Sequence, residues 1–325
     1  MVKIEKLNYI NNREFKKLVP FFNRTSNNFF INDLFFGLLS SINGILPLKM
    51  KFADETYLLI VDNETVASIT ISSIFGNPTR LLISQIRLKN NNYDSIKTLT
   101  DYVITKYGKA GISSFFVLFD ELNWDLGGCF VHSCGFRQCS AEEIWQIHDK
   151  NFQNSERIKY RRFENSDLEE VSEIYNDSII TYFKPTLQRI KGEFAEVNNH
   201  GLTQNSSYRY VIQDASSDKI ISYFNISTND NTNFIIDYNY SDGYDIDFDG
   251  IMYFVVREIS KRRKNYNLFL QTKRYLKISE PQKSYFVYKN FEWIRTELLL
   301  AKDFYKQINQ ASKVEEFAFA GQLQK

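Results

Sequence analysis

The sequence predicts an α/β fold, specifically an α+β mixed sheet, in which one order of elements occurs twice. The first observation is that short apolar runs typical of strands are interleaved with segments of helical periodicity. The second is that the order strand, two helices, three-stranded meander, helix, strand, helix, strand appears in both halves of the 325 residues. The third is a polar stretch without periodicity, His148–Arg157, between the two passes. We therefore expect two tandem domains, residues 1–150 and residues 151–325, the second ending in a C-terminal tail.

The first pass contains four helical regions and six strand-like apolar runs. A hairpin signal, Asp62-Asn63-Glu64-Thr65, joins the first two apolar runs of the meander. The expected elements are strand Val2–Leu7, helix Asn12–Phe22, a helical region through Leu46, strands Thr56–Val61, Val66–Ile74 and Arg80–Leu88, a helix carrying Ile96 to Tyr107, strand Ser113–Asp120, helix Leu122–Cys134 and strand Glu142–Ile147.

The second pass repeats this order after the polar stretch. Ser166 or Asp167 is expected to cap its first helix, which carries Leu168 to Tyr175. The other expected elements are strands Ile158–Phe163, Tyr208–Gln213, Ile220–Thr228 and Phe234–Tyr240, helix Ile251–Arg263, strand Leu268–Gln271, helix Pro281–Lys289 and strand Phe291–Leu300. We expect two mixed sheets, with Arg80–Leu88 beside Ser113–Phe119 and Phe234–Tyr240 beside Leu268–Gln271.

Composition excludes several classes of protein. A formal net charge of +1 gives no global attraction to nucleic acid or to anionic membrane. The most apolar stretch, Phe29–Leu48, carries too many polar residues for a membrane span and is interpreted as a buried helix. No signal peptide is recognised at Met1–Lys6, and three cysteines in one short stretch are not a disulfide framework, so a cytoplasmic location is expected. The aromatic share of 16% fits either an AT-rich genome, which we favour, or an apolar ligand tunnel.

Local sequence and element order together resemble the GCN5-related N-acetyltransferase (GNAT) superfamily. Arg161–Val171 resembles the family's opening strand and acidic-capped first helix. Phe130–Phe136 resembles its last helix, which closes on Gly-Phe, and Tyr285–Phe291 is a second copy with Asn290 in place of glycine. Asn is the usual substitute for Gly in a left-handed helix cap. The resemblance implies two tandem acyl-CoA N-acyltransferase-like domains.

The resemblance also implies where an acyl-CoA or acetyl-CoA donor would bind. In the family, the pyrophosphate lies at the N-terminus of the helix that follows the third meander strand, where unpaired N–H groups and the helix dipole favour an anion. The family's glycine-rich loop is eroded in both halves. In the first half the matching positions are Arg87, Leu88, Lys89, Asn90, Asn91, Asn92, Ser95 and Ile96, without glycine. In the second half, Asp242–Ile251 carries four carboxylates, each pair of which repels by about 1–3 kcal/mol at intermediate dielectric. We therefore expect the donor in the first half only.

The family's catalytic positions are also altered. The position of its tyrosine acid, five residues before the closing phenylalanine, holds Val131 and Phe286. Tyr285, Tyr288 and, in the first half, His132 are the alternative acids. A base is expected on the third meander strand, where Ser84 and Gln85 stand in one half and Asp237 in the other. The catalytic hypothesis is Asp237 as base with Tyr285 or Tyr288 as acid; the competing interpretation makes Asp237 a structural partner of a neighbouring group.

Two stretches of the sequence resemble metal-binding patterns, but no metal is expected. Asp245, Asp247 and Asp249 match the start of a calcium loop, but Val256 stands where the closing Glu should be, so a solvated acidic turn is favoured. Cys129, His132 and Cys134 share one helix and lack further zinc ligands, so they are interpreted, with Cys139, as core cysteines.

The leading functional hypothesis is therefore an acyltransferase that moves an acyl group from an acyl-CoA or acyl-carrier thioester to an amine of a small molecule or peptide. The alternative is a catalytically inactive tandem GNAT-like binding module. Missing loop glycines and missing tyrosines in both halves support this alternative. The acceptor, the acyl length and the oligomeric state stay open.

Overall fold

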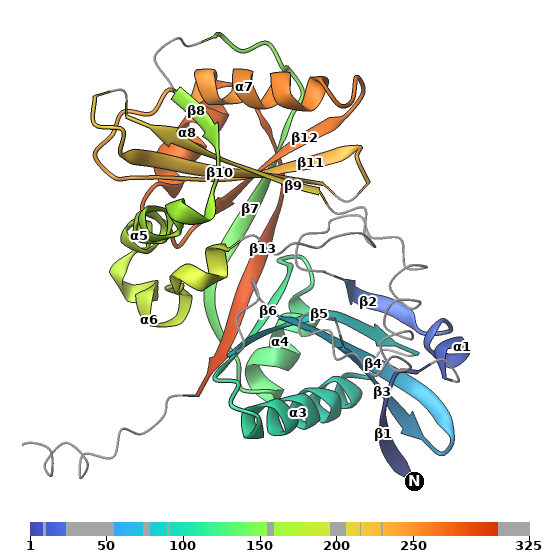
Figure 1. Cartoon of the computed structure of the whole chain (residues 1–325). Helices are drawn as coiled ribbons and strands as arrows, with labels where there is room; N and C mark the ends of the chain where they lie inside the picture. Colours follow the sequence, from blue (N-terminus) through green and yellow to red (C-terminus); the bar gives the residue numbers. More distant parts are fainter. Residues whose placement is uncertain are drawn as a thin grey trace, which may run out of the picture.

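The computed structural model describes residues 1–8, 11–23, 55–73, 79–89, 92–154, 159–195, 206–214, 216–228 and 230–304. The expected helical region through Leu46 and the tail beyond residue 304 lie outside these residues. The strands are β1 (Val2–Lys6), β2 (Val19–Asn23), β3 (Glu55–Val61), β4 (Glu64–Ser73), β5 (Arg80–Leu88), β6 (Ser114–Asp120), β7 (Arg137–Ile147), β8 (Lys159–Arg162), β9 (Ser206–Gln213), β10 (Ile220–Thr228), β11 (Asn233–Tyr240), β12 (Asn267–Lys273) and β13 (Glu292–Asp303) (Figure 1).

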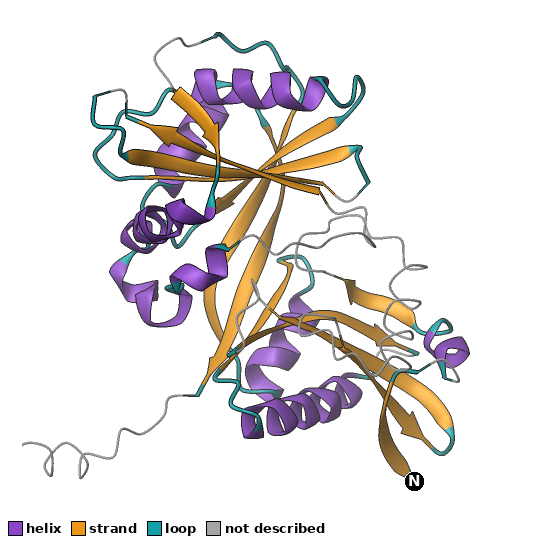
Figure 2. Cartoon of the chain, viewed as in Figure 1, coloured by secondary structure: helices purple, strands orange, loops and turns teal. Residues whose placement is uncertain are grey.

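Helices flank the strands in both halves (Figure 2). They are α1 (Asn12–Phe15), α3 (Tyr93–Lys109), α4 (Trp124–Gly128), α5 (Leu168–Ser178), α6 (Lys184–Leu187), α7 (Phe248–Ser260) and α8 (Ser279–Tyr288), with a π-helix at Cys129–Ser133 and 3-10 turns at Asn165–Asp167, Thr181–Phe183 and Lys191–Phe194. None of the helices in the described ranges is both long and apolar enough to cross a membrane. The left-handed caps predicted at the two closures are confirmed, because φ is +71° at Gly135 and +55° at Asn290.

The described strands form one continuous mixed sheet and not the two separate sheets that the sequence predicted. Its order is β1-β3-β4-β5-β6-β13-β7-β12-β11-β10-β9-β8, with β2 paired to β5 outside this path. The physical reason is an exchange of strands between the halves. β7, from the first half, pairs with β12 of the second, whereas β13, from the end of the second, pairs with β6 of the first. β7 and β13 pair with each other antiparallel at the centre.

The exchange also joins the hydrophobic cores. Leu298 and Leu300 of β13 pack into the core of the first half, beside Val117 and Phe119. Trp145 and Ile147 of β7 pack into the core of the second half. Each half therefore completes its core with a strand of the other. The boundary expected between residues 150 and 151 stays a prediction. The strands β7 and β13 each pair with a strand on the other side of it.

Both parallel strand pairs expected from the sequence are confirmed. Arg80–Ile83 of β5 pairs with Ser114–Val117 of β6, and Asn233–Asp237 of β11 pairs with Asn267–Gln271 of β12. In each half the pairing covers only the first part of the meander strand, so the two strands diverge beyond it. These two points of divergence are the places where the fold can receive a ligand between strands.

The helix predicted over Asn12–Phe22 is wrong in its second half. The helix α1 ends at Phe15, and the chain then forms β2. Pro20 explains the difference, because proline has no N–H for a helical hydrogen bond and disfavours helical geometry at the residue before it. β2 pairs with Gln85–Leu88 of β5, on the edge that β6 has left.

In the second half, the helices cover opposite faces of the sheet (Figure 1). Phe254 of α7 packs on Phe224 and Tyr210, and Phe286 of α8 packs on Trp145. Ser178 of α5 instead receives a hydrogen bond from Asn239 of β11, at 3.0 Å. Since adjacent strand residues point to opposite faces, one face of β11 is covered by α7 and α8 and the other by α5.

A charge pair fixes the start of the segment that leads into α5. Arg161 of β8 donates two hydrogen bonds to Asp167, at 2.6 and 2.8 Å, and Asp167 also accepts from the Glu164 N–H at 2.8 Å. Burial favours the neutral acid, but the Arg161 guanidinium and the Glu164 N–H outweigh it and hold the pKa of Asp167 below its ordinary value.

The exchange of strands predicts that the halves depend on each other for folding. Residues 1–150 and 151–325 expressed separately should be insoluble or molten, because β6 and β12 would each expose an unpaired edge. Co-expressed from one cell, the two fragments should copurify as a folded complex with a cooperative melting transition. Two separately soluble, cooperatively melting fragments would show that the exchange is dispensable.

The Arg161–Asp167 pair predicts a pH-dependent loss of stability. Asp167→Asn should lower the free energy of unfolding by about 1–3 kcal/mol at pH 7, because the bonds to Asp167 are charge-assisted. A carboxyl group whose pKa is depressed by folding stabilises the protein above its unfolded pKa of about 3.9, and this stabilisation is lost as the pH falls through the folded pKa. The difference in unfolding free energy between the two proteins in urea titrations should therefore be larger at pH 7 than at pH 3. An equal difference at both values would contradict this account.

Candidate functional site

The residues predicted to hold a donor in the first half are mostly engaged in the fold. The Arg87 guanidinium lies over the ring of Phe15, 4.5 Å from its centroid, and donates to Gln85 at 3.0 Å. Lys89 forms an ion pair with Glu64, and the Asn92 side chain caps α3 by accepting from the Asp94 N–H at 3.0 Å. Leu88, Ser95 and Ile96 are buried, and Asn90 and Asn91 lie outside the described residues. Of the proposed bases, Ser84 is buried and bonds Ser72 at 2.9 Å.

The edge of β5 at the divergence is occupied by the chain itself. Leu88 pairs with Ala67 of β4 on one side and with Val19 of β2 on the other. An extended ligand with amide groups, such as the arm of coenzyme A, binds an open strand edge through the hydrogen bonds that a peptide strand would make. At Gln85–Leu88 such a ligand would have to replace β2.

The corresponding helix start in the second half is occupied by carboxylates. Asp247 caps α7 and accepts from the Gly250 N–H at 2.9 Å. Asp249, in the first turn, accepts a hydrogen bond from Tyr285 and pairs with Lys289 at 2.7 Å. The positive end of the helix dipole therefore already faces negative charge from the protein. Among the described residues, no group of three or more His, Cys, Asp or Glu side chains is placed to bind a metal ion.

The backbone edge of β11 at its divergence is capped by side chains. Gln282 of α8 donates to the Tyr238 carbonyl at 3.2 Å. The Tyr240 N–H donates to the side-chain oxygen of Asn239 at 2.9 Å. Each of these groups would otherwise be available to a ligand that enters between β11 and β12.

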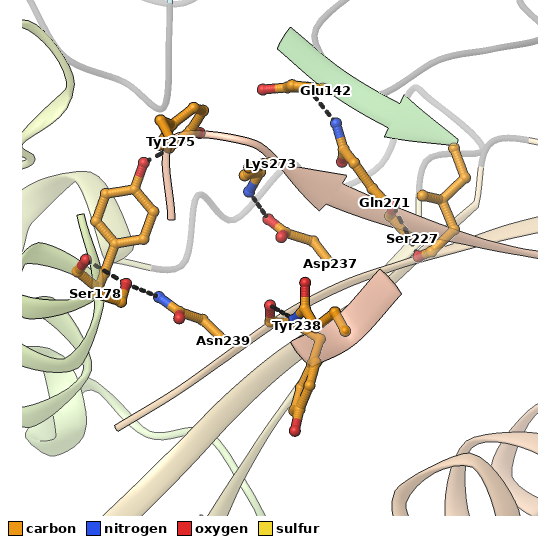
Figure 3. Close-up of polar contacts among 12 residues, drawn as sticks. Glu142, Ser178, Ser227, Asp237, Tyr238, Asn239, Gln271, Lys273 and Tyr275 are labelled. Carbon is orange, nitrogen blue, oxygen red and sulfur yellow. Dashed lines mark hydrogen bonds and ion pairs between the residues drawn. The ribbon is translucent and has the colours of Figure 1, made fainter. Parts of the chain in front are cut away.

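The structure does not bring the predicted catalytic residues together. Asp237 forms an ion pair with Lys273 on the face of β11 that α5 covers (Figure 3). Tyr285 donates to Asp249 and stacks on Phe248, which packs on Tyr238 on the opposite face. Burial, with Asp249 adding to it, raises the pKa of Tyr285, so Tyr285 keeps its proton. Tyr288 is exposed over 77% of its surface. The acid–base pair stays a prediction, and its members are on opposite sides of the sheet.

What the structure does assemble is a polar cluster around Asp237, drawn from α5, β11, β12 and β7 (Figure 3). Its contacts are Asp237 with Lys273, Glu142 with Gln271, Asn239 with Ser178, and Tyr175 with Tyr275 at 3.3 Å. We call these eight residues the Asp237 cluster. The Arg189 guanidinium adjoins it, 4.3 Å from the ring centroid of Tyr175.

The Asp237 cluster contains charges in a region that is otherwise core. Lys273 is only 5% exposed, whereas Asp237 is partly exposed. Burial disfavours the charged form of Lys273, but the Asp237 carboxylate outweighs burial and raises the pKa of Lys273 above its ordinary value. Lys273 is therefore protonated at neutral pH, and the Asp237 carboxylate is the more exposed member of the pair.

Sequence analysis found Asp237 but missed the rest of the cluster. The strand expected over Leu268–Gln271 continues to Lys273, which places the ammonium on the same face as Asp237. The polar residues at the end of this apolar strand were the sequence signal that could have revealed the cluster. Glu142 could not have been found in this way, because it reaches the second half through the exchanged strand β7.

No protein-family model matches the sequence, and no curated protein matches it significantly. Solved structures do match. A tandem GNAT protein from the clavulanic acid biosynthesis pathway, described without AcCoA, aligns at a TM-score of 0.60 with 8% identity over 94% of this chain and 100% of that chain. A putative acetyltransferase from Pyrococcus horikoshii aligns at 0.52 with 8% identity over 94% of this chain and 90% of that chain. A probable N-acyltransferase from Enterococcus faecalis V583 aligns at 0.50 with 10% identity over 93% of this chain and 72% of that chain. The chain therefore has the tandem GNAT fold, and identities this low show the fold alone.

The Asp237–Lys273 pair predicts unequal effects of its two single substitutions. Asp237→Asn should lower the free energy of unfolding by about 2–4 kcal/mol, because it leaves the buried Lys273 ammonium without a carboxylate. Lys273→Met should cost less, because Asp237 can be solvated at its exposed part and the methionine fills the apolar space. The double variant should recover part of the loss caused by Asp237→Asn. Denaturant titration of the four proteins measures this, and an unchanged stability of Asp237→Asn would show that the pair is not structural.

Proposed function

We propose that this protein is a ligand-binding module with the GNAT fold that does not transfer acyl groups from coenzyme A in the conformation described. The observation that carries the proposal is the pairing of β2 with Gln85–Leu88 of β5. In the half with the less acidic loop, this strand occupies the edge that a donor would need. The residues present therefore do not fit the donor there.

The second half supports the same conclusion by different means. The carboxylates of Asp247 and Asp249 lie at the start of α7, so a pyrophosphate at that place would meet repulsion instead of free N–H groups. Gln282 and Asn239 already satisfy backbone groups of β11 at the divergence. Binding of acyl-CoA would have to break both sets of contacts, and no compensating cation is placed at the loop among the described residues other than Lys289, which pairs with Asp249.

The Asp237 cluster is our candidate for the site at which the module binds its ligand. It contains a partly exposed carboxylate, flanked on one face of the sheet by the amides of Asn239 and Gln271 and by the buried phenols of Tyr175 and Tyr275. A carboxylate beside such donors and acceptors suits an ammonium group. The ligand class we propose is accordingly a small molecule or peptide that carries an amine, bound without acylation.

Acyl transfer from a thioester to such an amine is the second candidate, and the fold itself favours it. Lys89 pairs with Glu64 only at the surface, where ion pairs contribute about 0–1 kcal/mol, so its ammonium could be redirected to a phosphate. The helix α3 carries only Asp94 as an acidic residue in its first turn. This function requires β2 to leave β5.

Isothermal titration with acetyl-CoA and palmitoyl-CoA separates the two candidates. We expect no heat of binding with the wild-type protein. Micromolar binding of either thioester to the wild type would overturn the proposal. A variant in which residues 19–23 are replaced by a Gly-Ser segment of the same length tests whether β2 closes the site. If that variant gains binding, and Lys89→Glu in the same background reduces it by about 1–2 kcal/mol, then the first half is the donor site and the enzyme is the better description.

A second arm tests the ligand site. Primary amines and short peptides that bind the folded state should raise the melting temperature, and the rise should increase with the logarithm of ligand concentration once this exceeds the Kd. The matched controls are Asp237→Asn, which should lose the shift, and Glu64→Gln, which lies outside the cluster and should keep it. Amines that stabilise all three proteins equally would place the binding site elsewhere.

A further inference from the structure

Two cysteines that the proposed function does not use lie at the ends of one turn in the first half. Cys129 opens the π-helix Cys129–Ser133, and Cys134 caps it. The Cys134 N–H donates to the Cys129 carbonyl at 3.1 Å, which closes the turn. Both cysteines are free thiols, 7% and 2% exposed. π-helical turns are rare and occur frequently at functional sites.

The turn holds the two cysteines one above the other, because its closing backbone bond joins positions 134 and 129 across a single turn. The Cys129 sulfur also lies 3.7 Å from the Tyr93 carbonyl, at the first residue of α3. Disulfides require Cα atoms about 4.4–6.8 Å apart, and residues joined across one helical turn by a backbone hydrogen bond lie near that range. Cys139 lies on β7 beside Arg137, so it provides an internal control.

We propose that Cys129 and Cys134 are a redox-active thiol pair that forms a reversible intrachain disulfide when the protein meets hydrogen peroxide or a low-molecular-weight disulfide. The proposal stands on the closed turn that holds both thiols, and it does not depend on the proposed ligand or on acyl transfer.

The two thiols have different roles in the reaction. The hydrogen bond from Cys134 lowers the pKa of Cys129 against the opposing effect of burial, and Lys97 lowers it further. The hydrogen bond to Cys129, followed by burial, raises the pKa of Cys134, which therefore stays protonated. Because the thiolate is the nucleophile, Cys129 attacks first, and it is also the more accessible of the two.

With peroxide, the Cys129 thiolate attacks one oxygen, the O–O bond breaks, and a sulfenic acid and hydroxide result. The Cys134 sulfur then attacks the Cys129 sulfur, the S–O bond breaks, and the displaced hydroxide takes the Cys134 proton to give water. In sum, two thiols and one peroxide give one disulfide and two water molecules. With a small disulfide as oxidant, Cys129 forms a mixed disulfide, and Cys134 displaces the second small thiol.

The disulfide would act on the start of α3. Oxidation removes the Cys129 thiol as a partner of the Tyr93 carbonyl. It also cross-links the two ends of the turn that lies beside α3, the helix whose start the sequence indicated as the donor loop. The bond is thus placed to change the packing of the first half without contacting the Asp237 cluster.

Peptide mass spectrometry of the full-length protein tests the pair. Trypsin releases residues 110–137 as one peptide, which contains both Cys129 and Cys134, and residues 138–150 as another, which contains Cys139. After treatment with peroxide or oxidised glutathione and alkylation of remaining thiols, we expect residues 110–137 to be unalkylated and lighter by two hydrogen masses. Cleavage at Phe130 should leave its fragments joined, and dithiothreitol should restore both thiols. Cys139 should stay alkylated throughout.

Single variants distinguish this pathway from general oxidation. Cys134→Ser should stop at a sulfenic acid on Cys129 that dimedone traps, Cys129→Ser should give neither product, and Cys139→Ser should behave as the wild type. The proposal is overturned if all three thiols stay available for alkylation after treatment, because the cysteines are then inert core residues. It is equally overturned if Cys139 is oxidised as readily as the pair, or if Cys129→Ser still consumes the thiol of Cys134.

Discussion

The antiparallel pairing of β7 with β13 is the constraint on which the rest of the structure depends. Each half contains only one strand after its last helix, and that strand pairs with a strand of the other half. Without the central pair, one edge of β6 and one edge of β12 would carry unpaired N–H and C=O groups beside apolar side chains. The same pair carries Leu300 into one core and Trp145 into the other. The sheets of the two halves, each incomplete alone, therefore join into one continuous sheet.

This constraint also explains how the two halves differ at their points of divergence. Each meander strand parts from its parallel neighbour, because β6 and β12 are held in place by exchanged strands on their far sides. The backbone groups so released must be satisfied. In the first half β2 satisfies them as a strand, whereas in the second half Gln282 and Asn239 do so as side chains. The strand edges at the two divergences are therefore closed by different contacts, a strand in the first half and side chains in the second.

Sequence patterns predicted what depends on local periodicity and missed what depends on partners distant in sequence. The parallel pairs and the left-handed cap at Asn290 follow from apolar runs and from one residue's φ preference. The exchange could not be predicted, because nothing in the sequence of a strand such as β7 specifies which strands it pairs with. The helix expected over Asn12–Phe22 ends early because Pro20 prevents the helical hydrogen bond that the apolar spacing alone would allow. The faces on which Asp237 and Tyr285 lie could not be predicted, because facing depends on strand register, which the order of elements does not reveal.

The charges of the Asp237 cluster help to decide between a purely structural role and ligand binding. Replacing a buried ion pair with apolar side chains of similar volume is often neutral or stabilising, so the fold alone gives no reason to keep Lys273 at 5% exposure. A part of the carboxylate stays accessible, and amides and phenols surround it on the face that α5 covers. The edges of β5 and β11 are closed, whereas this face keeps an accessible charge. The observation that favours ligand binding over a purely structural role is therefore the accessible part of the Asp237 carboxylate, which an occupant with a complementary ammonium group would pair with.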